Sequence, residues 1–157
     1  MSRQHVAGAA IAVILGATGI AAYTTTHHAS ANYTPPKGAY NATVTQATIF
    51  STICTIGWTA TIRPSTSYTN ALKAKQMKAR HLPGIAASYE EDHLVALELG
   101  GHPTAESNLW PEARNGKHAT ASKKDAAENR LRKAVCSGTI TLGQARKQIT
   151  NPKEWTP

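Results

Sequence analysis

The residues of this chain best suited to chemistry lie between Tyr89 and Pro111, in the stretch YEEDHLVALELGGHPTAESNLWP. A carboxylate and an imidazole are neighbours there, in Asp92 and His93, and Asn108 follows the histidine by fifteen positions. An imidazole with an ordinary pKa of about 6.5 is largely unprotonated at neutral pH and can act as a general base. A carboxylate is a hard oxygen ligand suited to Mg²⁺ or a similar divalent ion. The pair could therefore supply the base and the cation that hydrolysis of a phosphodiester requires.

The spacing in this stretch resembles that of the HNH, or ββα-metal, nucleases. One branch of that family has the motif E-x-D-H-L-x-x-L-x-L-G-G followed by N-L-W-P, and this chain matches it from Glu90 to Gly101 and again from Asn108. The resemblance implies an α+β fold with a ββα-metal core. It also implies a divalent-metal-dependent endonuclease, with Mg²⁺ as the expected cofactor and Mn²⁺, Ni²⁺ or Zn²⁺ as the other candidates.

The resemblance assigns a role to each of three residues. His93 would be the general base, Asp92 would bind the metal, and the Asn108 amide would tie the loop back and orient the histidine without binding the metal. DNA is the expected substrate ahead of RNA. We expect cleavage without sequence preference, because no recognition helix or zinc finger is present to read base edges.

The second metal ligand is the position at which this sequence departs from the family pattern. It should fall about 22 to 28 residues after His93, where Asn115 and His118 are the candidates. Glu128 is the alternative, because a helical wheel places it and Lys124 toward the interior. A Lys-Asp-x-x-Glu run typical of this branch is formed by Lys124, Asp125 and Glu128.

Basic residues around the motif are candidates for binding phosphate. The segment before the motif also resembles this branch, so the likeness covers most of residues 49–155. Arg63 could bind a phosphate through two hydrogen bonds, although an ion pair with Glu90 or Glu91 is an equal alternative. The full set of candidates for nucleic-acid contact is Arg63, Lys73, Lys75 and Lys124.

The charge balance favours a polyanionic partner. The 157-residue chain has 17 Lys and Arg against 9 Asp and Glu. Only Arg3 among these precedes residue 32, so the rest of the chain has sixteen basic against nine acidic residues, a net charge of +7. Such an excess suits nucleic acid, an anionic membrane surface or an acidic wall polymer, and a basic face kept for solubility explains the charge alone equally well.

The alternative function follows from that charge. It is a non-catalytic protein that binds nucleic acid or another polyanion on a degenerate HNH fold. A zinc hydrolase of another substrate would need a ligand set such as H-E-x-x-H, which is absent.

The first 31 residues have the composition of a signal peptide. An apolar run from Val6 to Tyr23 is followed by Ala29-Ser30-Ala31, which has the small-x-small form of a signal-peptidase site. Cleavage by signal peptidase after Ala31 would leave a secreted or extracytoplasmic protein with no stable membrane association. The alternative is an uncleaved anchor, because the run is close to bilayer-spanning length.

The two cysteines fit an exported protein. A chain in an oxidising compartment with exactly two cysteines usually joins them. We therefore expect a disulfide between Cys54 and Cys136 that closes a loop of about 80 residues. Two buried free thiols are the alternative.

We expect a single domain over residues 42–157, preceded by a disordered or extended lead-in over residues 32–41. Its composition predicts two additional strands before the motif, Val44–Ile53 and Trp58–Arg63. The other expected elements are a helix capped by Thr66 or Ser67 and ending near His81, a hairpin turning at Gly100-Gly101, a helix over Thr120–Ser137 and a C-terminal helix over Thr141–Thr150.

A hairpin in the motif imposes a geometric condition on the site. Neighbouring residues of a regular strand point to opposite faces of the sheet. Asp92 and His93 can therefore serve one site only if the strand begins irregularly there or carries a bulge.

Overall fold

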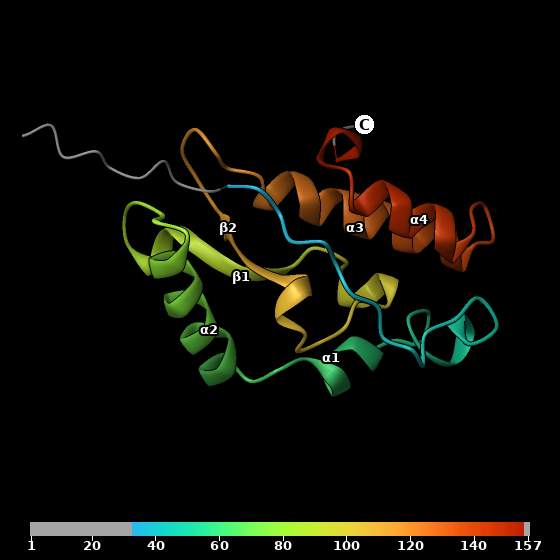
Figure 1. The fold of residues 1–157 in the computed structure, drawn as a ribbon. Coiled ribbons are helices and arrows are strands. Elements are labelled where there is room, and N and C mark those ends of the chain that lie inside the picture. The colour runs from blue at the N-terminus through green and yellow to red at the C-terminus, as the bar shows by residue number, and fades with distance from the viewer. Residues whose placement is uncertain (1–32, 156–157) are drawn as a thin grey trace, which may run out of the picture.

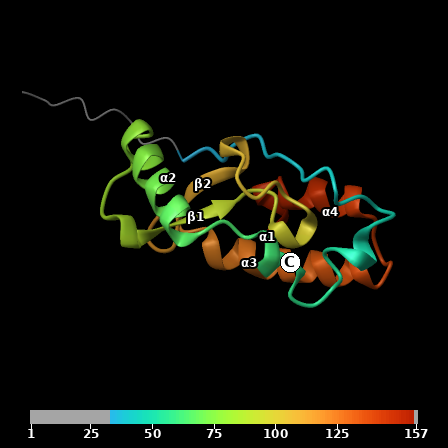
Figure 2. The ribbon, with the colours of Figure 1, turned by 90° about the horizontal axis from the view of Figure 1, so that it is seen from below.

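A computed structural model describes residues 33–155, which form an α+β arrangement built on a two-stranded antiparallel sheet. Its strands and helices are β1 (Tyr89–His93), β2 (Leu109–Ala113), α1 (Trp58–Ile62), α2 (Thr66–Ala79), α3 (Ala121–Cys136) and α4 (Leu142–Ile149). The sheet lies between α2 and α3 (Figure 1), and α2 lies in front of it when seen from below (Figure 2). The predicted signal peptide is outside the described residues, and no helix within them is long and apolar enough to span a membrane.

The two strands pair in a regular register, so no bulge separates Asp92 from His93. Asp92 lies opposite Trp110, and His93 lies opposite Leu109. Because side chains alternate along a regular strand, Asp92 and His93 point to opposite faces. Asp92 faces α3, and His93 lies on the face that α2 covers through Tyr89.

The hairpin is shorter than predicted, because the chain leaves the strand directly after His93. The next four residues are all buried instead of alternating between core and solvent. A 3-10 turn over Leu97–Leu99 leads to Gly100, whose φ of 75° lies in the left-handed region. A Cβ on Gly101 would overlap the carbonyl oxygen of Val95. The two glycines therefore turn a buried loop, and the prediction that they form the tip of the hairpin is wrong.

The two strands predicted before the motif are also wrong. Val44–Ile53 is a loop with a 3-10 turn at Ile49–Ser51, and Trp58–Arg63 is largely α1. The apolar side chains Ile49 and Ile53 are both buried and lie four residues apart, which is a helical spacing. Threonine hydroxyls in this segment donate to backbone carbonyls four or five residues earlier. Such local bonds compete with pairing in a sheet.

The described part of the lead-in, residues 33–41, is extended and attached to the loop between the strands. It makes backbone hydrogen bonds that join Gly38 to Ser107, Ala39 to His102 and Asn41 to Gly100. Arg146 of α4 fixes the same region, because its guanidinium donates to the carbonyls of Leu99, Val44 and Gly100. The loop is thus held from two sides by distant parts of the chain.

The predicted helices are confirmed, with small shifts at their ends. α2 begins after Ser65, whose hydroxyl accepts a hydrogen bond from the backbone N–H of Tyr68, so neither Thr66 nor Ser67 is the cap. α4 opens with a capping box between Thr141 and Gln144. The buried stripe of α3 consists of Ala121, Lys124, Ala127, Leu131 and Val135.

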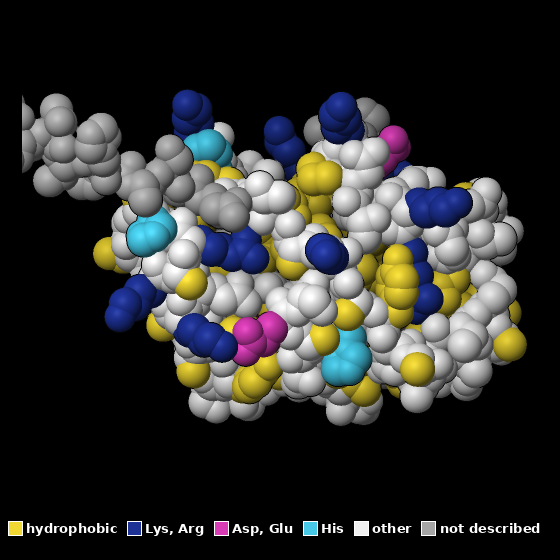
Figure 3. All heavy atoms as spheres, viewed as in Figure 1, with side chains coloured by type: hydrophobic (Ala, Val, Ile, Leu, Met, Phe, Trp, Pro, Cys, Tyr) yellow, Lys and Arg dark blue, Asp and Glu magenta, His cyan; other side chains and the backbone are white. Residues whose placement is uncertain are grey.

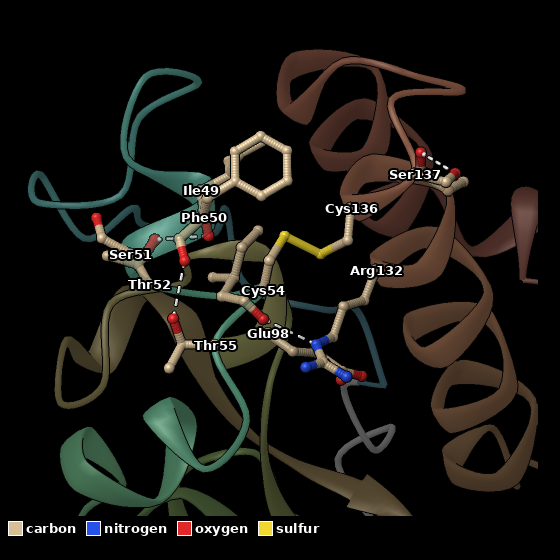
Figure 4. The surroundings of a disulfide bond; sticks show 12 residues. Ile49, Phe50, Ser51, Thr52, Cys54, Thr55, Glu98, Arg132, Cys136 and Ser137 are labelled. Carbon is tan, nitrogen blue, oxygen red and sulfur yellow. Dashed lines mark hydrogen bonds and ion pairs between the residues drawn. A yellow bond between two sulfur atoms is a disulfide. The ribbon is translucent and has the colours of Figure 1, made fainter.

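The predicted disulfide between Cys54 and Cys136 is present, which is consistent with an extracytoplasmic location. The two residues are 82 positions apart, and the bond joins the loop before α1 to the last residue of α3 (Figure 4). Arg132 Nε donates to the Ile53 carbonyl oxygen at 2.9 Å beside this bond. The N-terminal loop is therefore attached to α3 both covalently and by a hydrogen bond.

Reduction of this disulfide should lower the free energy of unfolding by about 4 kcal/mol, because the unfolded chain regains the entropy of a long closed loop. The measurement is urea unfolding at neutral pH with and without reductant. The Cys54→Ala/Cys136→Ala double variant should match the reduced wild type and should not respond to reductant. Equal midpoints for oxidised and reduced wild type would contradict the expected stabilisation.

Candidate functional site

The Asp92 carboxylate is held against α3 by Lys124. Lys124 Nζ donates to Asp92 Oδ2 at 2.5 Å and to Glu128 Oε1 one turn along the same helix. The lysine side chain is completely buried, while the carboxylates of Asp92 and Glu128 keep 21% and 14% of their surface exposed. A single ammonium thus joins a carboxylate of β1 to one of α3.

A third carboxyl, from Glu112 of β2, completes what we call the acid–lysine cluster: Asp92, Glu112, Lys124 and Glu128. Glu112 is fully buried, and burial together with the charge of Asp92 raises its pKa to about 9. It is therefore protonated at neutral pH beside Asp92, and neither of its carboxyl oxygens has a hydrogen-bond partner among the described residues.

The other pKa values in the cluster follow from the same contacts. Burial would raise the pKa of Asp92, but the charge and the hydrogen bond of Lys124 outweigh it, so this pKa is lowered. Burial would lower the pKa of Lys124, but the surrounding carboxylates raise it above its ordinary value. Burial raises the pKa of Glu128 to about 8. At neutral pH the Lys124 ammonium therefore faces the ionised Asp92 carboxylate and also contacts Glu128.

The cluster does not fit the divalent ion expected from the sequence. The Lys124 ammonium bonds Asp92 Oδ2 and Glu128 Oε1, so an ion bound between these two oxygens would need its place. Within residues 33–155, no three His, Cys, Asp or Glu side chains form a group that could hold a metal ion. The position of the cation is filled by a side chain of the protein itself.

The other two predicted metal ligands lie elsewhere. Asn115 and His118 line a cavity of about 420 Å³ at the end of the hairpin away from His93. The His118 ring stacks on Tyr33, with 3.7 Å between ring centroids. Of the three candidates for a second ligand, only Glu128 is brought to the same group as Asp92.

The His93 imidazole is oriented by the loop between the strands. Its Nε2 lies 2.8 Å from the carbonyl oxygen of Pro103. Because a carbonyl only accepts, Nε2 carries the proton and Nδ1 carries the lone pair of the neutral ring. Burial lowers the pKa of His93, and the charge of Arg63 contributes in the same direction. The ring is therefore a neutral base at physiological pH, although only 4% of the residue is exposed.

Asn108 ties this loop together through its side-chain amide. Its Oδ1 accepts from the backbone N–H groups of Val95 at 2.9 Å and Ala39 at 3.3 Å. Its Nδ2 donates to the carbonyls of Val95 at 3.1 Å and His102 at 3.0 Å. It makes no direct bond to His93, so its effect on the imidazole passes through the loop that carries Pro103.

Arg63 is the predicted phosphate-binding residue that lies near the imidazole. It is exposed, and its charge acts on the pKa of His93. The alternative pairing with Glu90 is not formed, because Glu90 pairs with Arg114 at 2.8 Å. The Glu91 carboxyl is buried without a hydrogen-bond partner.

The predicted lysines differ in their accessibility. Lys75 pairs with Glu106 at 2.9 Å on the surface, and Lys73 donates to the Tyr89 carbonyl oxygen at 3.1 Å. Lys124 is completely buried, so its prediction as a nucleic-acid contact is wrong. It belongs to the interior stripe of α3, where its charge serves Asp92.

Two residues of the site were missed from the sequence. Glu112 lies two positions after Trp110, which pairs with Asp92, so strand alternation places Glu112 on the same face as Asp92. That alternation was the available signal. No sequence signal pointed to Pro103, because this residue contributes only a backbone carbonyl to the site.

The chain matches no protein-family model, and neither the curated proteins nor the solved structures contain a significant match to it. The resemblance to HNH nucleases therefore rests on the sequence pattern of this chain alone.

Stability should depend on pH through Glu112. Its pKa is about 9 in the folded protein against an ordinary 4.5, so the folded state holds a proton that the unfolded chain releases between those values. Stability therefore falls as the pH rises through this window, by on the order of 1 kcal/mol per pH unit for one proton. Glu112→Gln cannot ionise at this position. The difference in unfolding free energy between this variant and the wild type should therefore shift in favour of the variant as the pH rises from 5 to 9. Glu106→Gln, at an exposed site, is the control, and parallel curves for Glu112→Gln and wild type would rule out this role.

Proposed function

We propose that the protein is an exported phosphodiester hydrolase of the endonuclease type, acting on nucleic acid and on DNA in the first place. The observation that carries the proposal is the state of His93. Its ring is neutral, its Nε2–H is held by the Pro103 carbonyl, and its loop is tied by Asn108. The order β1, β2, α3, with α3 against the hairpin, supports a ββα arrangement of the HNH kind.

In this proposal the reaction uses two groups: the His93 imidazole as the base and the exposed Arg63 guanidinium as the cation. His93 Nδ1 takes a proton from water, the water oxygen bonds to phosphorus, and the bond from phosphorus to the leaving oxygen breaks. The leaving oxygen takes a proton from solvent, and the imidazolium returns its proton to solvent. Arg63 would hold the phosphate charge near the imidazole. No step runs through a metal ion at Asp92, because Lys124 holds that carboxylate.

The basic surface supports a nucleic-acid substrate. Lys and Arg side chains are spread over the face shown in Figure 3, and few Asp or Glu side chains appear on it. Such a surface attracts the phosphate backbone without reading sequence.

A second candidate function is a non-catalytic protein that binds nucleic acid or another polyanion. Two observations favour it: His93 is only 4% exposed, and Lys124 occupies the place of a catalytic cation. The basic surface serves this candidate as well as the first.

Plasmid nicking separates the two candidates. Purified protein lacking residues 1–31 should nick supercoiled DNA, and His93→Ala should lower the rate by about 10²- to 10⁴-fold through loss of the base. His81→Asn, which removes an exposed imidazole at a backbone position with φ 54° that Asn tolerates, is the matched control. Reactions with Mg²⁺, with Mn²⁺ and with EDTA, on DNA and on RNA, define cofactor and substrate. Retention of DNA without cleavage in all of them would select the binding protein.

The nicking rate should rise with pH and reach half its maximum below pH 6.5. The lowered pKa of His93 is the reason, because the base is lost only when the imidazole is protonated. Single-turnover rates between pH 4.5 and pH 8 give the profile. A midpoint above pH 7 would assign the base to another group.

A further inference from the structure

In the acid–lysine cluster, the Lys124 ammonium lies at the point where two acidic side chains converge. Asp92 Oδ2 and Glu128 Oε1 converge on Lys124 Nζ, and Glu112 lies beside Asp92. The lysine side chain has no exposed surface, so it does not serve a ligand on the outside of the protein.

We propose that Lys124 is the built-in cation of this cluster, and that it excludes divalent metal ions from Asp92 and Glu128. The proposal holds whether or not the chain cleaves nucleic acid. It separates this protein from metal-dependent hydrolases that use a carboxylate at the same place in their motif.

The position of Lys124 on α3 keeps its ammonium between the two acidic side chains. It belongs to the buried stripe of the helix, between Ala121 and Ala127. Its side chain has 0% exposure, so the ammonium is enclosed between α3 and the hairpin. Breaking such a buried pair by removing one partner is strongly destabilising. A divalent ion would have to overcome that loss before it gained any ligand.

The charge of the cluster supports the same conclusion. One ammonium already contacts both acidic side chains, Asp92 and Glu128. A divalent ion added to the intact cluster would lie beside that ammonium, and the repulsion between the two cations is unfavourable.

Two neutral substitutions of Lys124 test the proposal. Lys124→Ala removes the charge and leaves room between the carboxylates, whereas Lys124→Met removes the charge and fills the room. At pH 8, MnCl₂ should raise the melting temperature of Lys124→Ala by about 5 °C or more. It should leave wild type and Lys124→Met within about 1 °C of their metal-free values, because neither offers a place for the ion. Adding Asp92→Asn to Lys124→Ala should abolish the response.

Either of two results would overturn the proposal. One is a Mn²⁺-dependent rise in the melting temperature of the wild type that Asp92→Asn removes. The other is an equal response of the Ala and Met variants. If neither variant folds, equilibrium dialysis of the wild type against Mn²⁺ decides: one ion bound per chain and lost in Asp92→Asn overturns the proposal, and no ion bound at Asp92 supports it. These readouts do not use cleavage, so failure of the proposed nuclease activity would be seen separately.

Discussion

The buried contact between Lys124 and Asp92 is the interaction on which the arrangement of this protein depends. It joins α3 to β1 across 32 residues of sequence, at 2.5 Å and without exposure of the lysine. A buried charge that loses its partner is costly, so the contact fixes where α3 lies on the hairpin. Glu112 of β2 lies beside Asp92 and interacts with it electrostatically. Both strands and α3 therefore contribute side chains to the same cluster.

The regular pairing of the strands divides the motif between two environments. Asp92 belongs to the face packed on α3, and His93 belongs to the opposite face, near Arg63 and the loop that carries Pro103. Adjacent residues therefore have different surroundings: the Asp92 carboxylate pairs with the buried Lys124, and the His93 imidazole is hydrogen-bonded to the Pro103 carbonyl. A single metal ion bridging both side chains is not compatible with this geometry.

Much of the helical structure could be predicted because its signals are local. A capping residue and apolar side chains three or four positions apart lie within one segment, and α3 and α4 form where such signals place them. The strands predicted before the motif failed because a strand needs a partner. Threonine and isoleucine are as compatible with the loop and helix observed there as with a sheet, and only the rest of the fold decides between them.

The sequence by itself determined the inventory of the site: a carboxylate next to an imidazole, an asparagine that closes the loop, an excess of positive charge and two cysteines that join. It also determined that Lys124 lies on the inward face of its helix. Only the tertiary structure decided that this lysine contacts Asp92, and that a backbone carbonyl orients His93. The physical reason is that both contacts join separate segments, so they depend on how α3 docks and where the loop runs, which no local pattern of residues encodes.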